Sequence, residues 1–125
     1  MKKILLIEDD YYTIELYKEI FKKGGFEFEV LQWGQEAIEY LKEIREGTRE
    51  KPDLILLDLI LPDINGIEVL KEIKKDEKIK DIIVYILTNY IEPQLTKELI
   101  RLGANKFLVK TEFNPQELLD LIKKI

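Results

Sequence analysis

The residues best suited to chemistry in this sequence directly follow short runs of apolar residues. These polar residues are Glu8, Asp9 and Asp10 after the first run, Asp58 after the third, Thr88 after the fourth and Lys110 after the fifth. Carboxylates are ligands that Mg²⁺ prefers, and an ammonium and a hydroxyl can bond a phosphoryl group. The set therefore suits Mg²⁺-dependent phosphoryl chemistry, provided that the fold brings its members together.

Each of these residues, taken alone, also has an ordinary structural interpretation. An acid pair after a strand often caps the next helix, and we predict that Asp10 is such an N-cap. Asp58 could form a turn ahead of the loop "LPDING". Thr88 could be a strand-end hydroxyl and Lys110 a surface lysine. The joint pattern favours a functional site, because perturbed polar groups cluster at such sites.

Short apolar runs and amphipathic stretches alternate along the whole sequence. The runs are residues 4–7, 26–30, 54–57, 82–87 and 106–109. All but one are nearly continuous, which is typical of strands covered on both faces, whereas 26–30 alternates as an edge strand does. Between and after the runs, apolar residues recur at helical spacing. They are Ile14, Tyr17 and Phe21; Ile38, Leu41 and Ile44; Ile67, Leu70 and Ile73; Leu95, Leu99 and Leu102; and Leu118, Leu121, Ile122 and Ile125.

Glycine and proline mark the ends of these helices. Gly24, Gly47 and Gly103 lie just past three of them, where a left-handed cap is expected. Pro93 stands near the start of the fourth helix, and Asn114 is the predicted N-cap of the fifth, followed by a proline.

The strand–helix pair, repeated along residues 1–125, predicts a single α/β domain. We expect a three-layer, flavodoxin-like (βα)5 sandwich, with a parallel sheet in strand order 2-1-3-4-5 and helices on both faces. Strands 1 and 3 would be neighbours about 5 Å apart, which crowds Asp9 and Asp58 together with Glu8 close by. Like charges at this distance require a cation, and Lys110 and Mg²⁺ are the candidates.

Composition excludes several classes of function. The sequence has no cysteine and no histidine, which excludes disulfides, thiolate chemistry, imidazole bases and histidine-bound metals. A formal net charge of −5 argues against binding of nucleic acid. No apolar run approaches the length of a membrane span. We therefore expect a soluble, cytoplasmic protein that contacts neither nucleic acid nor membrane.

Four segments together resemble the receiver domain of two-component response regulators, the CheY-like superfamily. They are "ILLIEDD", "DLILLDLILPDINGIEVLKEIK", "VYILTN" and "LGANKFLVK". Each motif alone is modest, but the four occur in order and with the spacing of the family over essentially the whole chain. The resemblance implies a phosphorylatable signalling domain.

The resemblance also implies roles for the acids. Asp58 matches the phosphoacceptor and is also expected to bind the metal. Asp9 matches a direct Mg²⁺ ligand, and Glu8 matches an acid that binds the metal through water. The backbone carbonyl of Ile60, two residues after the acceptor, would be a further ligand. Mg²⁺ is the expected cofactor, and Mn²⁺ could replace it.

The residues expected to respond to phosphorylation are Thr88, Lys110 and Phe107. Thr88 matches the hydroxyl that turns toward the phosphoryl group, and Lys110 matches the lysine that pairs with a phosphoryl oxygen. Phe107 occupies the position of a switch aromatic that is often tyrosine, although plain core packing also explains it. The family usually has proline after the lysine, whereas this sequence has Thr111, so we expect no cis peptide bond there.

Ile60 and Tyr90 lie two residues past the acceptor and two past the threonine. In the family these positions flank the path of the water that hydrolyses the acyl phosphate. An apolar and a bulky side chain there would obstruct that water, so we expect a long-lived phosphoryl group. Both could instead be incidental loop residues.

The leading hypothesis is a phosphoacceptor switch in a phosphorelay, which catalyses only its own phosphorylation and dephosphorylation. Its expected donor is a sensor histidine kinase or a phosphotransfer protein. The expected output is docking or self-association through the face formed by helix 4, strand 5 and helix 5. The sequence ends with helix 5, and a segment of a longer regulator would read the same.

Two alternatives belong to other classes. A Mg²⁺-dependent phosphohydrolase with an aspartyl nucleophile usually has an acid/base aspartate two residues later, where this sequence has Ile60. A flavodoxin-like binding module would need a glycine-rich phosphate loop after strand 1, where "EDDYYT" stands. Turnover of a phosphomonoester would distinguish the enzyme from the switch.

Overall fold

The apolar runs form a parallel sheet that lies between two layers of helices. The structure is a computed structural model, and it describes residues 2–89 and 92–125. The strands are β1 (Lys3–Ile7), β2 (Glu27–Leu31), β3 (Leu54–Asp58), β4 (Ile83–Thr88) and β5 (Lys106–Val109). Their order is β2-β1-β3-β4-β5, which confirms the predicted topology. The carboxyl ends of these parallel strands therefore meet at one edge of the sheet.

The amphipathic stretches form the helices that the spacing predicts. They are α1 (Tyr11–Gly24), α2 (Gly34–Glu46), α3 (Gly66–Lys75), α4 (Pro93–Arg101) and α5 (Pro115–Lys123), and a short 3₁₀ turn, η1 (Lys110–Glu112), precedes α5. Among the described residues, no helix combines the length and apolarity that crossing a membrane requires.

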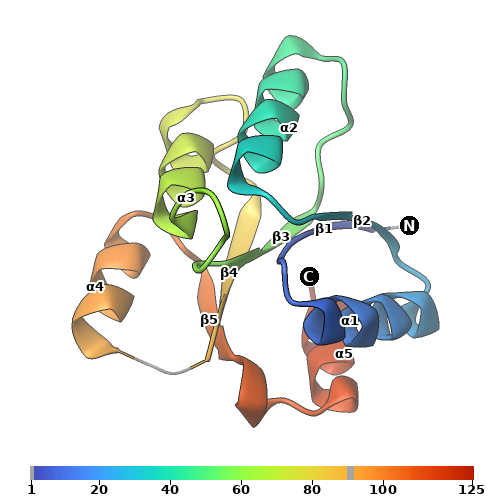
Figure 1. Ribbon diagram of the computed structural model, residues 1–125. Helices are drawn as coiled ribbons and strands as arrows, with labels where there is room; N and C mark the ends of the chain where they lie inside the picture. The colour runs from blue at the N-terminus through green and yellow to red at the C-terminus, as the bar shows by residue number, and fades with distance from the viewer. Residues whose placement is uncertain (1, 90–91) are drawn as a thin grey trace.

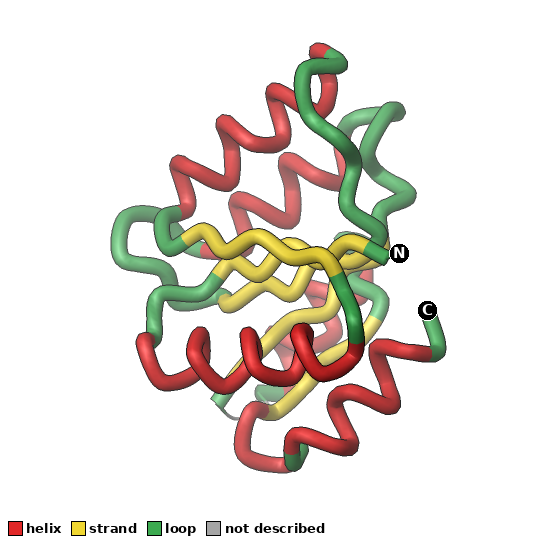
Figure 2. The backbone as a smooth tube through the Cα atoms, turned by 90° about the vertical axis from the view of Figure 1, so that its right-hand side faces the viewer, coloured by secondary structure: helices red, strands yellow, loops and turns green. Residues whose placement is uncertain are grey.

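The helices divide between the two faces of the sheet. Helices α1 and α5 cover one face, and α2, α3 and α4 cover the other (Figure 1). Successive strand residues point to opposite faces, so Ile4 and Leu6 join the α1/α5 core while Leu5 and Ile7 join the other. Figure 2 shows the strands enclosed between the two helical layers. This two-sided burial explains why β1, β3 and β4 are nearly continuously apolar, whereas the edge strand β2 alternates and is only partly buried.

The ends of the helices agree with the sequence in most cases. Asp10 accepts a hydrogen bond from the Thr13 backbone N–H at 2.9 Å, as expected of the N-cap of α1. Asn114 accepts one from the Glu117 N–H at 2.8 Å at the start of α5. Gly47, with φ of 81°, has the predicted left-handed conformation after α2.

The prediction that Gly24 caps α1 is wrong. Gly24 is the last helical residue, and Gly25 takes the left-handed conformation with φ of 74°. Gly24 is small for a different reason: a Cβ there would lie 2.5 Å from Leu119 Cδ1 and 2.5 Å from Phe26 Cε2. The absence of a side chain lets Leu119 of α5 and Phe26, which directly precedes β2, pack closely against the end of α1.

Candidate functional site: an acidic cluster with a half-buried lysine

The acids converge where β1 and β3 end side by side. Ile7 and Leu57 are partners in the β1–β3 register, so the next residues, Glu8 and Asp58, are neighbours at the edge of the sheet. The Glu8 side chain is fully buried and Asp58 is 7% exposed, whereas Asp9 is exposed. One carboxylate oxygen from each of these acids lies within 4.8 Å of the others. The cluster is therefore open to solvent mainly on the Asp9 side.

Lys110 reaches this cluster from the end of β5, the edge strand on the other side of β4 from β3. It is the first residue of η1, directly after β5, and its ammonium donates to Glu8 Oε1 and, at 3.2 Å, to Asp58 Oδ2. Only 13% of the Lys110 side chain is exposed. The peptide bonds of the described residues are all trans, so the turn at Thr111 forms without a cis bond. Lys110 thus ends a buried run because its charge is used inside the cluster.

Burial and crowding determine the electrostatics of the cluster. Burial, together with the nearby Asp58 carboxylate, raises the pKa of Glu8 to about 8, against the opposing effect of Lys110. Burial lowers the pKa of Lys110, but the two carboxyl groups of Glu8 and Asp58 raise it by more than burial lowers it. The pKa of Lys110 is therefore raised above its ordinary value. The lysine consequently keeps its charge between the two carboxyl groups.

One carboxylate oxygen of the cluster, Glu8 Oε2, is buried and accepts no hydrogen bond from the described residues. A buried acceptor without a donor is costly, and a cation or the water bound to it would satisfy it. The donor set of oxygens around Asp9 and Asp58 fits a hard divalent cation such as Mg²⁺.

Thr88 and Asp58 line the same small cavity. This cavity, of about 150 Å³, lies between the β3–α3 loop and the segment after β4, and Asn65, Asn89 and Glu92 also line it. Asp58 pairs with Leu87 across β3 and β4, so Thr88 is the next residue along the edge. Thr88 is half-buried and closes β4.

The structure places two of the other expected residues, Phe107 and Ile60, in different surroundings. Phe107 pairs with Ile86 in the register of β4 and β5, is partly buried, and packs against the core beneath α2, α3 and α4. This packing agrees with the alternative interpretation of Phe107 as a core residue. Tyr90 lies outside the described residues. Ile60 lies at the site: its N–H donates to Asp58 Oδ1 at 3.0 Å, and its side chain is 68% exposed.

Sequence reasoning missed two residues that shape the site, Asp63 in the β3–α3 loop and Gly66 at the start of α3. A Cβ on Gly66 would lie 2.5 Å from the Asp58 carbonyl oxygen and 2.7 Å from Leu59 Cα, so only glycine allows α3 to begin this close to the end of β3. Asp63 accepts hydrogen bonds from the start of α2. The Asn-Gly pair in "LPDING" marks a turn and hints at Gly66, whereas nothing local indicates the partner of Asp63.

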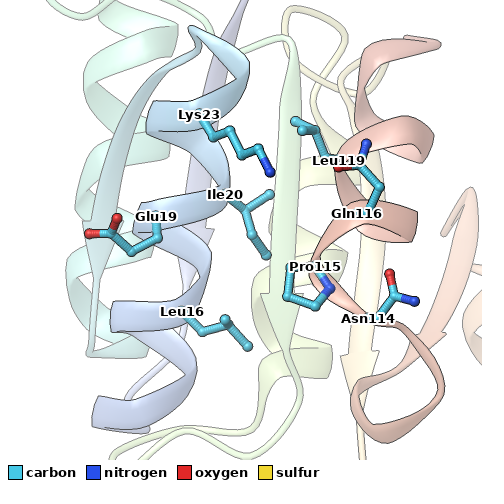
Figure 3. Close-up of a pocket in the computed structure, with 8 residues that line it drawn as sticks. All are labelled: Leu16, Glu19, Ile20, Lys23, Asn114, Pro115, Gln116 and Leu119. Carbon is cyan, nitrogen blue, oxygen red and sulfur yellow. The ribbon is translucent and has the colours of Figure 1, made fainter.

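A larger cavity lies away from these acids. It has a volume of about 520 Å³ and is found between α1 and α5, lined by Leu16, Ile20 and Leu119 with Glu19 and Lys23 among its polar residues (Figure 3). The two charged side chains have opposite signs, and both belong to α1. The groove lacks the cluster of acids that metal-dependent chemistry requires, so the sheet edge is the candidate site.

Known proteins share both the sequence pattern and the fold. The response regulator receiver domain family matches residues 4–123. Sporulation initiation phosphotransferase F of Bacillus subtilis is 36% identical, over 98% of this chain and 92% of its own length. The phosphorylated cyanobacterial phytochrome response regulator RcpA is 35% identical, over 98% and 89% of the two chains, with a TM-score of 0.84. The Mn²⁺-bound response regulator Rcp1 is 33% identical, over 100% and 91%, with a TM-score of 0.83.

An acidic edge of a 2-1-3-4-5 sheet, with a lysine held among the acids, is the arrangement of a phosphoacceptor switch. The chain belongs to the response regulator receiver domain family. It is a receiver domain of the two-component phosphorelay class, and these domains are signalling switches. The family match and the three relatives named above give no support to the phosphohydrolase alternative.

Proposed function

We propose that Asp58 accepts the phosphoryl group, with Mg²⁺ held by Asp9, Asp58 and the Ile60 carbonyl and by Glu8 through water. The observation that carries this proposal is the contact of Lys110 with both Glu8 and Asp58, which gathers one cation and several acids around a single reactive carboxylate. The Mn²⁺-bound Rcp1, which shares the fold, supports a divalent metal in such a site.

The residues of the chain account for the steps of transfer. An Asp58 carboxylate oxygen forms a bond to phosphorus while the bond from phosphorus to the donor's leaving atom breaks, and the leaving atom keeps the electron pair. The Ile60 N–H holds Asp58 Oδ1 by a hydrogen bond and thereby orients the second oxygen of the carboxylate, Oδ2. Lys110 neutralises charge that develops on the phosphoryl oxygens. Mg²⁺, when bound, would neutralise the remaining charge of the incoming phosphate.

After transfer, Thr88 and Lys110 are proposed to bond the new phosphoryl oxygens. Both groups belong to the ends of β4 and β5, so their movement would favour one of two arrangements of the neighbouring loops. Phe107 would repack in the same transition only if it leaves its core position. The output is proposed to be docking or self-association on the α4–β5–α5 face, where Ile100 on α4 is 56% exposed.

Other finer assignments complete the proposal. Residues 1–125 would act as one receiver domain, and the chain would catalyse only its own phosphorylation and dephosphorylation. A sensor histidine kinase or phosphotransfer protein would supply the phosphoryl group, and the Bacillus relative is itself named a phosphotransferase. The cytoplasmic location expected from the sequence stays a prediction.

Intact-mass spectrometry after incubation with acetyl phosphate and Mg²⁺ tests the proposal. We expect one added phosphoryl group on the wild-type protein, and none after chelation of the metal or in the Asp58→Asn variant. The Asp53→Asn variant, which alters an exposed acid at the opposite end of β3, serves as the matched control and should be phosphorylated normally. Phosphorylation that persists in Asp58→Asn would refute the assignment of the acceptor.

A further inference from the structure

One side chain ties the loop between β3 and α3, residues 59–65, to the start of α2. Asp63 Oδ1 accepts from the Gly34 N–H at 2.7 Å, and Oδ2 accepts from the Gln35 N–H at 2.9 Å. First-turn N–H groups of a helix have no partner within the helix. Trp33, the N-cap residue of α2, provides no acceptor for these two groups, so Asp63 caps α2 from another part of the chain.

The same contact is closely packed. A Cβ on Gly34 would lie 2.2 Å from Ile64 Cγ1 and 3.2 Å from Asp63 Oδ1, so the loop is seated directly on the helix start. Ile64 packs against the core beneath α2, α3 and α4. Helices α2 and α3 lie side by side on that face of the sheet (Figure 1). The tip of the loop is therefore held by hydrogen bonds and by packing.

The base of the loop belongs to the acidic site. The Ile60 N–H donates to Asp58 Oδ1, and Ile60 forms an isolated antiparallel bridge with Asn65. The Gly66 N–H donates to the Leu59 carbonyl at 2.8 Å and closes the loop. The bridge between Ile60 and Asn65 closes the loop into one short unit. We therefore expect a movement of Asp63 at the tip of the loop to change the orientation of the Ile60 peptide group beside Asp58.

We propose that Asp63 is a positioning residue for the metal site. By holding the loop against α2, Asp63 keeps the Ile60 carbonyl and the Asp58 carboxylate oriented for Mg²⁺. This inference rests on the proposed function, which makes Ile60 a source of a metal ligand. Coupling of this kind is reciprocal, so Mg²⁺ binding should also stabilise the hydrogen bonds of Gly34 and Gln35 to Asp63.

The test compares Mg²⁺ binding by calorimetry in wild-type protein and in three variants. Asp63→Ala removes both hydrogen bonds, whereas Asp63→Asn removes the charge but keeps an oxygen that can accept one of them. Asp53→Ala is the matched control, because Asp53 Oδ2 accepts from the Lys3 N–H at 2.8 Å and likewise joins distant parts of the chain. Amide hydrogen exchange at Gly34 and Gln35, with and without Mg²⁺, gives a readout that does not depend on phosphorylation.

For Asp63→Ala we expect Mg²⁺ affinity to fall by about tenfold, the low end for partners of metal ligands. Asp63→Asn should lie between that variant and wild type, and Asp53→Ala should bind as wild type does. Mg²⁺ should slow exchange at Gly34 and Gln35 in the wild type only. If Mg²⁺ affinity falls equally in Asp63→Ala and Asp63→Asn, the negative charge of Asp63 and not its hydrogen bonds to α2 supports Mg²⁺ binding. That result would overturn the inference.

Two further outcomes separate this inference from the proposed function. Wild-type binding of Mg²⁺ together with unchanged affinity in a folded Asp63→Ala variant would overturn the positioning role and leave the function intact. A wild-type protein that binds no Mg²⁺ would overturn the proposed function and the inference with it.

Discussion

Lys110 donates a hydrogen bond to Glu8, a residue 102 positions earlier in the sequence, and the Glu8 side chain has no exposed surface. The strands that precede these residues, β5 and β1, are not neighbours, because β3 and β4 lie between them. The lysine therefore reaches across the edge of the sheet, and in the metal-free protein it is the cation that compensates Glu8 and Asp58.

Replacement of Lys110 by methionine should destabilise the metal-free protein. The change leaves the buried Asp58 carboxylate without its cation and Glu8 without its hydrogen-bond donor, which costs about 3 kcal/mol at neutral pH, the lower end for a broken buried pair. Added Mg²⁺ should recover part of this loss because it supplies the missing charge. Urea unfolding with and without Mg²⁺ measures both effects. Lys106→Met, on an exposed residue of β5, is the control; equal stabilities of the two variants would contradict the prediction.

Gly66→Ala should disturb the site through the backbone. The new Cβ would lie 2.5 Å from the Asp58 carbonyl oxygen, so α3 must move away from β3, at a cost of about 1–3 kcal/mol. We also expect slower phosphorylation by acetyl phosphate. Thermal unfolding and intact mass over time provide the measurements. Lys71→Ala, on the exposed part of α3, is the control and should change neither the stability nor the rate of phosphorylation. If Gly66→Ala has the same stability and rate as this control, the close contact between α3 and the Asp58 carbonyl does not constrain the site.

The contribution of Asp63 to stability should depend on pH. Desolvation raises the pKa of Asp63, but the N–H groups of Gln35 and Gly34 lower it more, so the net pKa lies below the ordinary value of 3.8. A carboxyl group whose pKa is lower in the folded state stabilises the fold above 3.8, and this stabilisation is lost as the pH falls through the folded-state pKa.

Urea unfolding of wild type and Asp63→Ala at a series of pH values measures this contribution. The difference between their free energies of unfolding should be constant near neutral pH and should shrink in acid below the ordinary pKa of Asp63. A difference that persists unchanged in strong acid would show that the carboxylate charge is not responsible.

The double variant Ile60→Asn, Tyr90→Glu should lose its phosphoryl group faster than the wild type. Polar side chains at both positions would admit and orient the hydrolytic water. We expect the decay rate of the Asp58 phosphate to rise by at least about threefold, which corresponds to about 0.7 kcal/mol of barrier. Loss of phosphate mass after removal of acetyl phosphate follows the decay. An unchanged rate would mean that neither side chain controls access of water.

The convergence of Glu8, Asp58 and Lys110 was predictable because it follows from topology alone. In a parallel sheet of known strand order, the residue after each strand has a fixed place, whatever the details of packing. The same reasoning places Thr88 beside Asp58. Strand and helix positions were likewise predictable, since both depend on the spacing of apolar residues along the chain.

The parts that could not be predicted depend on contacts between distant segments. Either Gly24 or Gly25 could have ended α1, and the outcome depends on how Leu119 and Phe26 pack against Gly24. The bond from Asp63 to α2 joins residues 29 positions apart, and no local motif records it. The apolar residues around Phe107 in the sequence suit both a core residue and a switch residue. The sequence therefore could not decide whether Phe107 packs in the core, and the structure was needed to show it.

Every residue of β1 and β3 is buried, from Lys3 to Ile7 and from Leu54 to Asp58. Neither strand therefore offers a surface position at which the signalling properties of the domain could be adjusted without repacking its interior. Substitutions that adjust donor choice or signal lifetime are therefore expected outside these two strands, for example in the connections at the carboxyl edge, where Asp9 and Ile60 are exposed.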